Sequence, residues 1–218
     1  NVYVLVLLMI AHKGEILAMS ASPTRYIVAT SATDKTVRLW QIYPDALDAE
    51  SGAGNDTPLS AVDLAIPTSI GGDALEKKKK TSSKCCQPFS RSSIDSKVNA
   101  LCFSPCGKYL AAGANYCDTP DGYVVIWGFG NDSFEGYVVH AFRSRPTVRF
   151  ASVRALCFGM DGRDGSAHYS HLLFAGDVNG VVWCFNTDTQ QLIGKILHHK
   201  DVIYGIGCGN NGWFDIYV

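Results

Sequence analysis

Internal repetition is the feature that most constrains this chain of 218 residues. Two strings nearly coincide, "NALCFSPCG" starting at Asn99 and "RALCFGMDG" starting at Arg154, and each opens a longer pattern. The pattern is an apolar strand, a turn, a second strand, a tight turn, and a third strand that ends in an aromatic residue. Three copies are present, and "KDVIYGIGC" starts a fourth. Repeated units of this size bury their apolar faces against one another, which predicts a single stacked array.

The turns of the repeat identify its secondary structure. The strings "PDGYV" and "VNGVV" place Asp-Gly or Asn-Gly between β-branched runs, which is the strongest short signal for a hairpin. Lys35 departs from that preference in the first copy. Trp40 lies six positions after Asp34, and Trp127 lies six positions after Asp121. With 21 Gly and 11% aromatic residues, the chain fits an all-β fold.

The first copy, "HKGEILAMSASPTRYIVATSATDKTVRLW", resembles a WD40 repeat. The resemblance implies that His12, Thr30, Asp34 and Trp40 form the structural hydrogen-bond tetrad of that family. It also places Trp127 and Phe185 at the tryptophan position of the second and third copies. Those copies depart from the tetrad, because Ala112 and Ala175 replace the threonine. We therefore expect their strand pattern, rather than the tetrad, to define them as blades.

The resemblance implies an all-β chain of WD40-type β-propeller blades, about three full blades with partial ones at both ends. We expect these residues to be part of a larger propeller, because an open arc would expose sheet edges. The expected units are an outer strand of a preceding blade with blade 1 (1–43), a disordered insertion (44–97), blade 2 (98–130), a second insertion (131–151), blade 3 (152–197) and the start of a further blade (198–218).

Composition and motifs narrow the function classes. The formal net charge of −1 gives no global electrostatic case for nucleic acid or an anionic membrane. The opening run "VYVLVLLMI" is too short to span a bilayer as a helix, and we expect a buried strand there. Catalytic and phosphate-loop motifs are missing from the sequence, and its eight cysteines form no C-x-x-C pair. We therefore predict no enzyme activity, no metal, no cofactor and a reducing, intracellular location, cytoplasmic or nuclear.

The leading hypothesis is a non-catalytic scaffold that binds other proteins or peptide segments in a multiprotein assembly. Alignment with the first copy places the partner-facing positions beside the tetrad, at the entry of each inner strand and in each tight turn. These positions are Lys13, Glu15, Thr33, Lys97, Asn99, Pro120, Arg154 and Val178. Two alternatives stay open: an accessory propeller of a larger catalytic or membrane-trafficking protein, and an RNA or ribosome-assembly factor that uses the run Lys77–Lys80.

Overall fold

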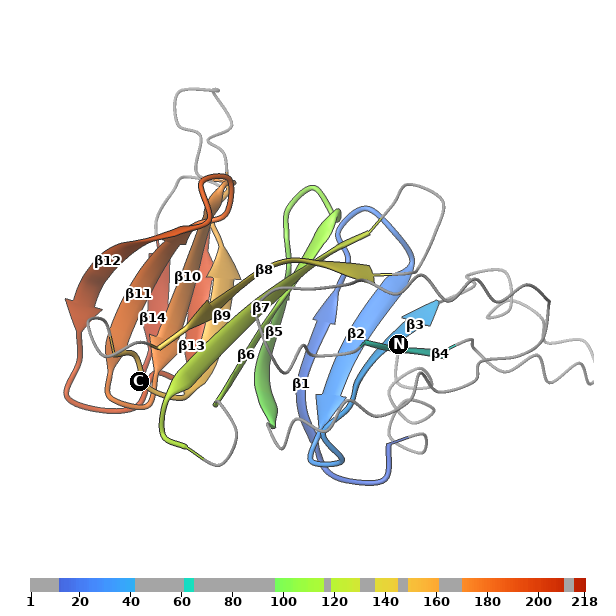
Figure 1. Cartoon of the computed structure of the whole chain (residues 1–218), viewed down its shortest axis with the longest axis horizontal. Coiled ribbons are helices and arrows are strands. Elements are labelled where there is room, and N and C mark those ends of the chain that lie inside the picture. The colour runs from blue at the N-terminus through green and yellow to red at the C-terminus, as the bar shows by residue number, and fades with distance from the viewer. Residues whose placement is uncertain are drawn as a thin grey trace, which may run out of the picture.

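Apolar alternation and tight turns produce a fold of antiparallel sheets, as predicted. The computed structural model describes residues 12–41, 61–64, 97–115, 119–129, 136–144, 149–160, 170–209 and 214–218, and every regular element in these ranges is a β-strand. Accordingly, these ranges contain no apolar helix of the length that crossing a membrane requires. Figure 1 shows the sheets side by side as an open arc, from blue strands at one end to orange strands at the other.

Three four-stranded sheets and one two-stranded sheet make up the arc, and each four-stranded sheet keeps its strands in chain order. Blade 1 comprises β1 (Ile16–Ala21), β2 (Ile27–Ala32), β3 (Val37–Gln41) and β4 (Ala61–Leu64). Blade 2 comprises β5 (Val98–Phe103), β6 (Tyr109–Asn115), β7 (Gly122–Phe129) and β8 (Gly136–Arg143). Blade 3 comprises β9 (Val153–Phe158), β10 (Leu172–Asp177), β11 (Val181–Asn186) and β12 (Gln191–His198). The last sheet pairs β13 (Gly205–Cys208) with β14 (Phe214–Tyr217).

The fourth strand of a blade is the element that the repeat pattern does not mark. β4 lies in the range 44–97 and β8 in the range 131–151, the two ranges predicted as insertions. β8 pairs with β7 over seven residue pairs, so the eight residues of β8 in the predicted insertion 131–151 belong to the blade 2 sheet. The remainder of 44–97, apart from residue 97, lies outside the described residues, and so does the run of residues 1–11.

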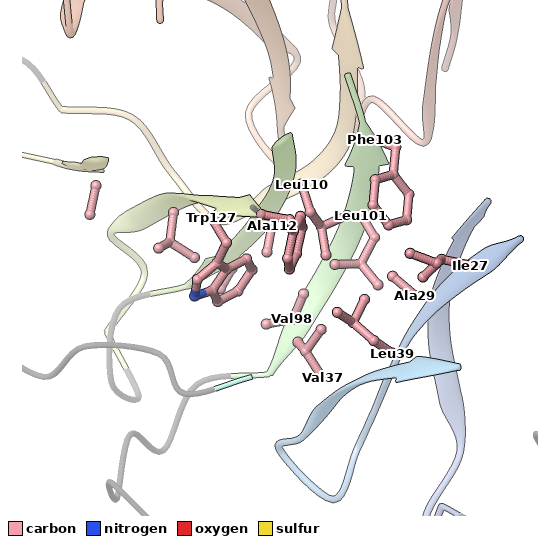
Figure 2. Close-up of a cluster of buried hydrophobic side chains, with 14 of the residues drawn as sticks. Ile27, Ala29, Val37, Leu39, Val98, Leu101, Phe103, Leu110, Ala112 and Trp127 are labelled. Atoms are coloured by element: carbon pink, nitrogen blue, oxygen red, sulfur yellow. The ribbon is translucent and has the colours of Figure 1, made fainter. Parts of the chain in front are cut away.

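The core lies between neighbouring blades rather than inside one of them. Side chains of β2 and β3 pack against β5, β6 and β7, and Figure 2 shows Val37 and Leu39 facing Val98, with Trp127 on the blade 2 side. A second cluster joins the other face of blade 2 to blade 3, and a third joins blade 3 to the sheet of β13 and β14. Blade 2 is therefore covered on both faces, and every residue of β7 is buried.

Two glycines let each inner strand lie close to the preceding blade. Gly113 in β6 and Gly176 in β10 occupy equivalent positions, each opposite an inner strand of its own sheet. A Cβ at Gly113 would lie 2.9 Å from Cβ of Val153, and one at Gly176 would lie 2.8 Å from Cβ of Ile203. Real Cβ atoms do not approach so closely, so these positions require glycine for packing rather than for a special φ angle.

Candidate functional site

The structure brings His12, Thr30, Asp34 and Trp40 into one hydrogen-bonded network in blade 1. Trp40 Nε1 donates to Thr30 Oγ1 over 2.8 Å, and Thr30 Oγ1 lies 2.7 Å from His12 Nε2. The other ring nitrogen, His12 Nδ1, lies 3.1 Å from Asp34 Oδ2. A neutral imidazole with its proton on Nδ1 satisfies every donor and acceptor in this series. The network lies on the face of blade 1 that points away from blade 2, since Trp40 is absent from the cluster between them.

Further donors fix the Asp34 carboxylate in the tight turn. Thr36 Oγ1 donates to Asp34 Oδ1 over 2.7 Å, and the Lys13 amide donates to Asp34 Oδ2 over 3.0 Å. Burial alone would raise the pKa of Asp34, but hydrogen bonds from Thr36, Lys13 and His12 outweigh burial and lower the pKa. The carboxylate is therefore held ionised at neutral pH, where it fixes the turn to the start of the inner strand.

Trp127 and Phe185 occupy the same sheet register as Trp40. Each aromatic residue pairs with an aliphatic residue of the second strand of its blade. The pairs are Trp40 with Val28, Trp127 with Leu110, and Phe185 with Leu173. Trp127 is buried between blades 1 and 2, and Phe185 is buried between blades 2 and 3. The ring of Phe185 lies 4.5 Å from that of Phe142 and 5.7 Å from that of Phe150, centroid to centroid. Both side chains pack one blade against the previous one.

Blade 3 contains a second polar network, which the sequence comparison missed. Trp183 Nε1 donates to Asp177 Oδ2 over 2.8 Å, and the Ala151 amide donates to the same oxygen over 3.2 Å. The amides of Asn179 and Val181 both donate to Asp177 Oδ1 over 2.9 Å. Asp177 is only 1% exposed, so four N–H donors replace the water that its carboxylate loses on burial. The available signal was the acidic residue just before the turn in "GDVNG".

Asp177 differs from Asp34 in its place on the blade. Asp177 ends its strand and pairs with Val153, whereas Asp34 lies in the turn beyond Ala32, the residue that pairs with Ile16. The two carboxylates thus secure the same corner of a blade from different backbone positions. Trp183, which the sequence analysis did not include among the site residues, is the indole donor of this network.

The predicted partner-facing residues lie along one edge of the arc, which we call the rim. The rim consists of the residues before and at the start of the inner strands β1, β5, β9 and β13, together with the turns β2–β3, β6–β7 and β10–β11. It contains Lys13, Glu15, Thr33, Lys97, Asn99, Pro120, Arg154 and Val178. Hydrogen bonds cross from blade to blade along it: Ser31 Oγ to Val98 O over 2.9 Å, Ser152 N to Pro120 O over 3.1 Å, and Ile203 N to Asp177 O over 3.4 Å.

Most predicted rim residues present their side chains to solvent, and a few also hold the rim together. Lys13, Glu15, Lys97, Pro120 and Arg154 are exposed, whereas Thr33, Asn99 and Val178 are half-buried. Thr33 and Glu15 exchange two hydrogen bonds, through the Thr33 hydroxyl and through the two backbones. Asn99 Nδ2 contacts Ser152 Oγ over 3.5 Å, and the Val178 amide donates to Ser152 O over 3.0 Å.

The cysteines of the inner strands behave as small apolar residues. Within the described ranges, Cys102, Cys106, Cys157, Cys184 and Cys208 are free thiols. Burial, reinforced by Cys102 and Cys208, raises the pKa of Cys157 to about 12, so this thiol stays protonated at neutral pH. The same ranges contain no group of three His, Cys, Asp or Glu side chains arranged to hold a metal ion.

Sheets, register and rim define a partial β-propeller, and comparisons with known proteins identify its type. The family model described as "WD domain, G-beta repeat" matches residues 4–41 and 83–128. These two segments of the chain are therefore WD40 repeats. In the structure of the RRP9 WD40 repeats, 42% of the chain aligns with 90% of this one at a TM-score of 0.52 and 19% identity. The computationally designed Ika4 protein aligns over 92% of its length and 95% of this chain, with a TM-score of 0.53 and 16% identity.

Two curated relatives show how much of a longer protein the repeats can represent. COMPASS component SWD3 of Saccharomyces cerevisiae is 24% identical over 93% of this chain and 65% of its own length. WD repeat and HMG-box DNA-binding protein 1 of Xenopus laevis is 27% identical over 62% of this chain but only 13% of its own length. The chain therefore spans less than two thirds of either relative.

Proposed function

We propose that this chain is a non-catalytic scaffold whose rim binds other proteins or peptide segments within a multiprotein assembly. The observation that carries the proposal is that different groups of the rim connect the blades and face the solvent. Backbone groups and short polar side chains connect neighbouring blades, while the long side chains of Lys13, Lys97 and Arg154 extend into solvent. A rigid surface loses little backbone conformational entropy when its exposed side chains bind a partner. SWD3, named as a component of COMPASS, is consistent with a role in an assembly.

A photo-crosslinking amino acid tests this proposal directly. Placed at Asn99 or at Val178 on the rim, it should crosslink specific proteins in an extract from the source cells. The matched control places it at Ile193 or Ile196, which are exposed on β12. Crosslinks that form equally well from β12, or from neither position, would contradict a partner site on the rim.

A second candidate is an accessory propeller region of a larger protein. It is favoured by the match to WD repeat and HMG-box DNA-binding protein 1, in which the matching segment makes up 13% of the protein's length. The complete coding sequence on either side of these residues decides between the two: a neighbouring catalytic domain or helical solenoid supports the accessory role. The RNA-binding alternative depends on Lys77–Lys80, which lies outside the described residues.

A further inference from the structure

The exposed charges of the rim are mainly basic, although the whole chain is nearly neutral at a net charge of −1. Among the described residues of the rim and of the connections that enter it, six basic side chains are exposed: Lys13, Lys35, Lys97, Arg149, Arg154 and Lys200. The exposed acidic residues among the described residues of the same region are Glu15 and Asp201, which lie near its two ends. Lys97 and Arg154, on the inner strands of blades 2 and 3, occupy the middle of the rim.

The other described carboxylates of the rim are buried or half-buried and accept hydrogen bonds from the protein itself. Asp177 accepts four N–H donors and is 1% exposed, and Asp34 accepts from Thr36 and the Lys13 amide. Asp121 accepts a hydrogen bond from Ser144 Oγ over 3.4 Å. These groups use their acceptor capacity on the blades themselves, which leaves the basic side chains as the charges that a partner meets.

Lys97 and Arg154, the two basic side chains in the middle of the rim, are not paired with acidic neighbours in the described part of the chain. None of Lys13, Lys97, Arg149, Arg154 and Lys200 takes part in the contact of 3.1 Å that joins His12 Nδ1 to Asp34 Oδ2. The backbone that carries these side chains is held in place. Lys97 precedes Val98, whose carbonyl accepts a hydrogen bond from Ser31, and Arg154 follows Val153 on a paired strand. A charged side chain on a rigid backbone loses little backbone conformational entropy when it binds an oppositely charged partner.

We propose that the partner segment of the rim is acidic, with Asp or Glu side chains that pair with Lys97 and Arg154. This inference rests on the proposed function, because it names the chemistry of the partner at the same surface. A protein segment is favoured over nucleic acid because Glu15 and Asp201 flank the basic centre. A continuous phosphate backbone would be repelled at both ends, whereas a peptide can place carboxylates opposite the centre only.

Fluorescence anisotropy on the whole 218-residue chain tests the inference with labelled acidic, neutral and basic peptides of equal length. The acidic peptide should bind, and its affinity should fall between about 50 mM and about 500 mM NaCl as screening increases. The double variant K97E/R154E should weaken binding at least about tenfold, because it replaces two attractions with two repulsions. The control K108E/K195E makes the same change of charge away from the rim and should alter affinity less than about twofold.

Each other outcome overturns the inference. Equal losses in the two double variants would show that binding follows net charge rather than the rim. Tighter binding of a single-stranded oligonucleotide that K97E/R154E abolishes would assign the surface to nucleic acid. Binding of a neutral or basic peptide instead would contradict the inference of an acidic partner. So would the absence of peptide binding while rim positions still crosslink proteins, and in both cases the proposed scaffold function would stand. Thermal melts of both double variants, which alter exposed residues, confirm that they remain folded.

Discussion

Single carboxylates decide how the corners of two blades in this molecule are held. In blade 1, Asp34 in the tight turn fixes His12, which in turn contacts Thr30. In blade 3, Asp177 at the strand end accepts directly from Trp183 without an intervening histidine. Both arrangements satisfy an indole N–H and the carboxylate, which is buried at Asp177 and half-buried at Asp34, as burial requires of polar groups.

The lowered pKa of Asp34 makes blade 1 sensitive to acid. Because the folded pKa lies below the unfolded value of about 3.9, ionisation of Asp34 stabilises the fold above that value, and the contribution is lost as pH falls through the folded pKa. Urea unfolding from neutral to acidic pH should therefore show wild type losing its advantage over Asp34→Asn below about pH 4. The exposed Asp188→Asn is the control. A gap between wild type and Asp34→Asn that stays constant into acid would contradict the assigned role.

The Asp177 network predicts a large effect from an isosteric change. Asp177→Asn places an amide donor against N–H groups that all need acceptors, and it removes a charge that strengthens four hydrogen bonds. We expect the free energy of unfolding to fall by about 2–4 kcal/mol. Chemical denaturation of this variant beside Asp188→Asn measures the loss. Trp183→Phe, which removes a single N–H donor, should cost less; a neutral Asp177→Asn would mean that the network contributes little.

Sequence spacing located the residues of one network and not those of the other. The interval from Asp34 to Trp40, with His12 upstream, follows the family pattern and places all four tetrad residues. In the third copy, the position six before the aromatic residue Phe185 is Asn179, although the carboxylate of blade 3 comes from Asp177. Spacing could not reveal that the carboxylate comes from a different sequence position, because it can reach the same corner of the blade from either one.

At the scale of elements, the first three strands of each blade were predictable and the fourth was not. β5 and β9 have nearly the same sequence. The apolar residues of each strand divide between the two clusters on either side of its blade. β8 is less regular: Tyr137 and Val138 are both exposed, and the register with β7 shifts between Ile126 and Trp127. An outer strand is constrained by one neighbouring strand and by solvent, so its sequence carries little periodic signal.

The glycine at the contact between blades 2 and 3 gives a prediction about element packing. In Gly113→Ala, the new Cβ would meet the side chain of Val153, a fully buried residue at the start of β9. Blade 3 must then move away from blade 2, and we expect a loss of about 1–3 kcal/mol in the free energy of unfolding. Gly207→Ala is a matched control on an inner strand, since its Cβ would have no neighbour closer than 3.9 Å. Equal stabilities of the two variants in chemical denaturation would contradict close packing at Gly113.

At the scale of the whole molecule, stability is distributed unevenly along the arc. Each blade contributes its faces to clusters shared with its neighbours, so no blade has a complete core of its own. Blade 2 shares both of its faces, and its strand β7 is buried throughout. The sheet of β13 and β14 shares one cluster, and Tyr204, Tyr217 and Val218 beside it are each at least 60% exposed. Unfolding of the arc should therefore begin at the end that holds β13 and β14.

Hydrogen exchange measured by mass spectrometry on the intact chain tests this gradient. Amides of β6 and β7 open only when two clusters are disrupted, so their exchange should be the slowest in the chain. Amides of β13 and β14 should exchange faster by orders of magnitude, because separation from β9 and β10 exposes one small cluster. Adding a bound partner provides the control: a rim ligand should slow exchange at the starts of β5 and β9 without changing the order of the blades. Uniform protection from β1 to β14 would instead show that the arc unfolds as one cooperative unit, with the shared clusters coupling all its blades.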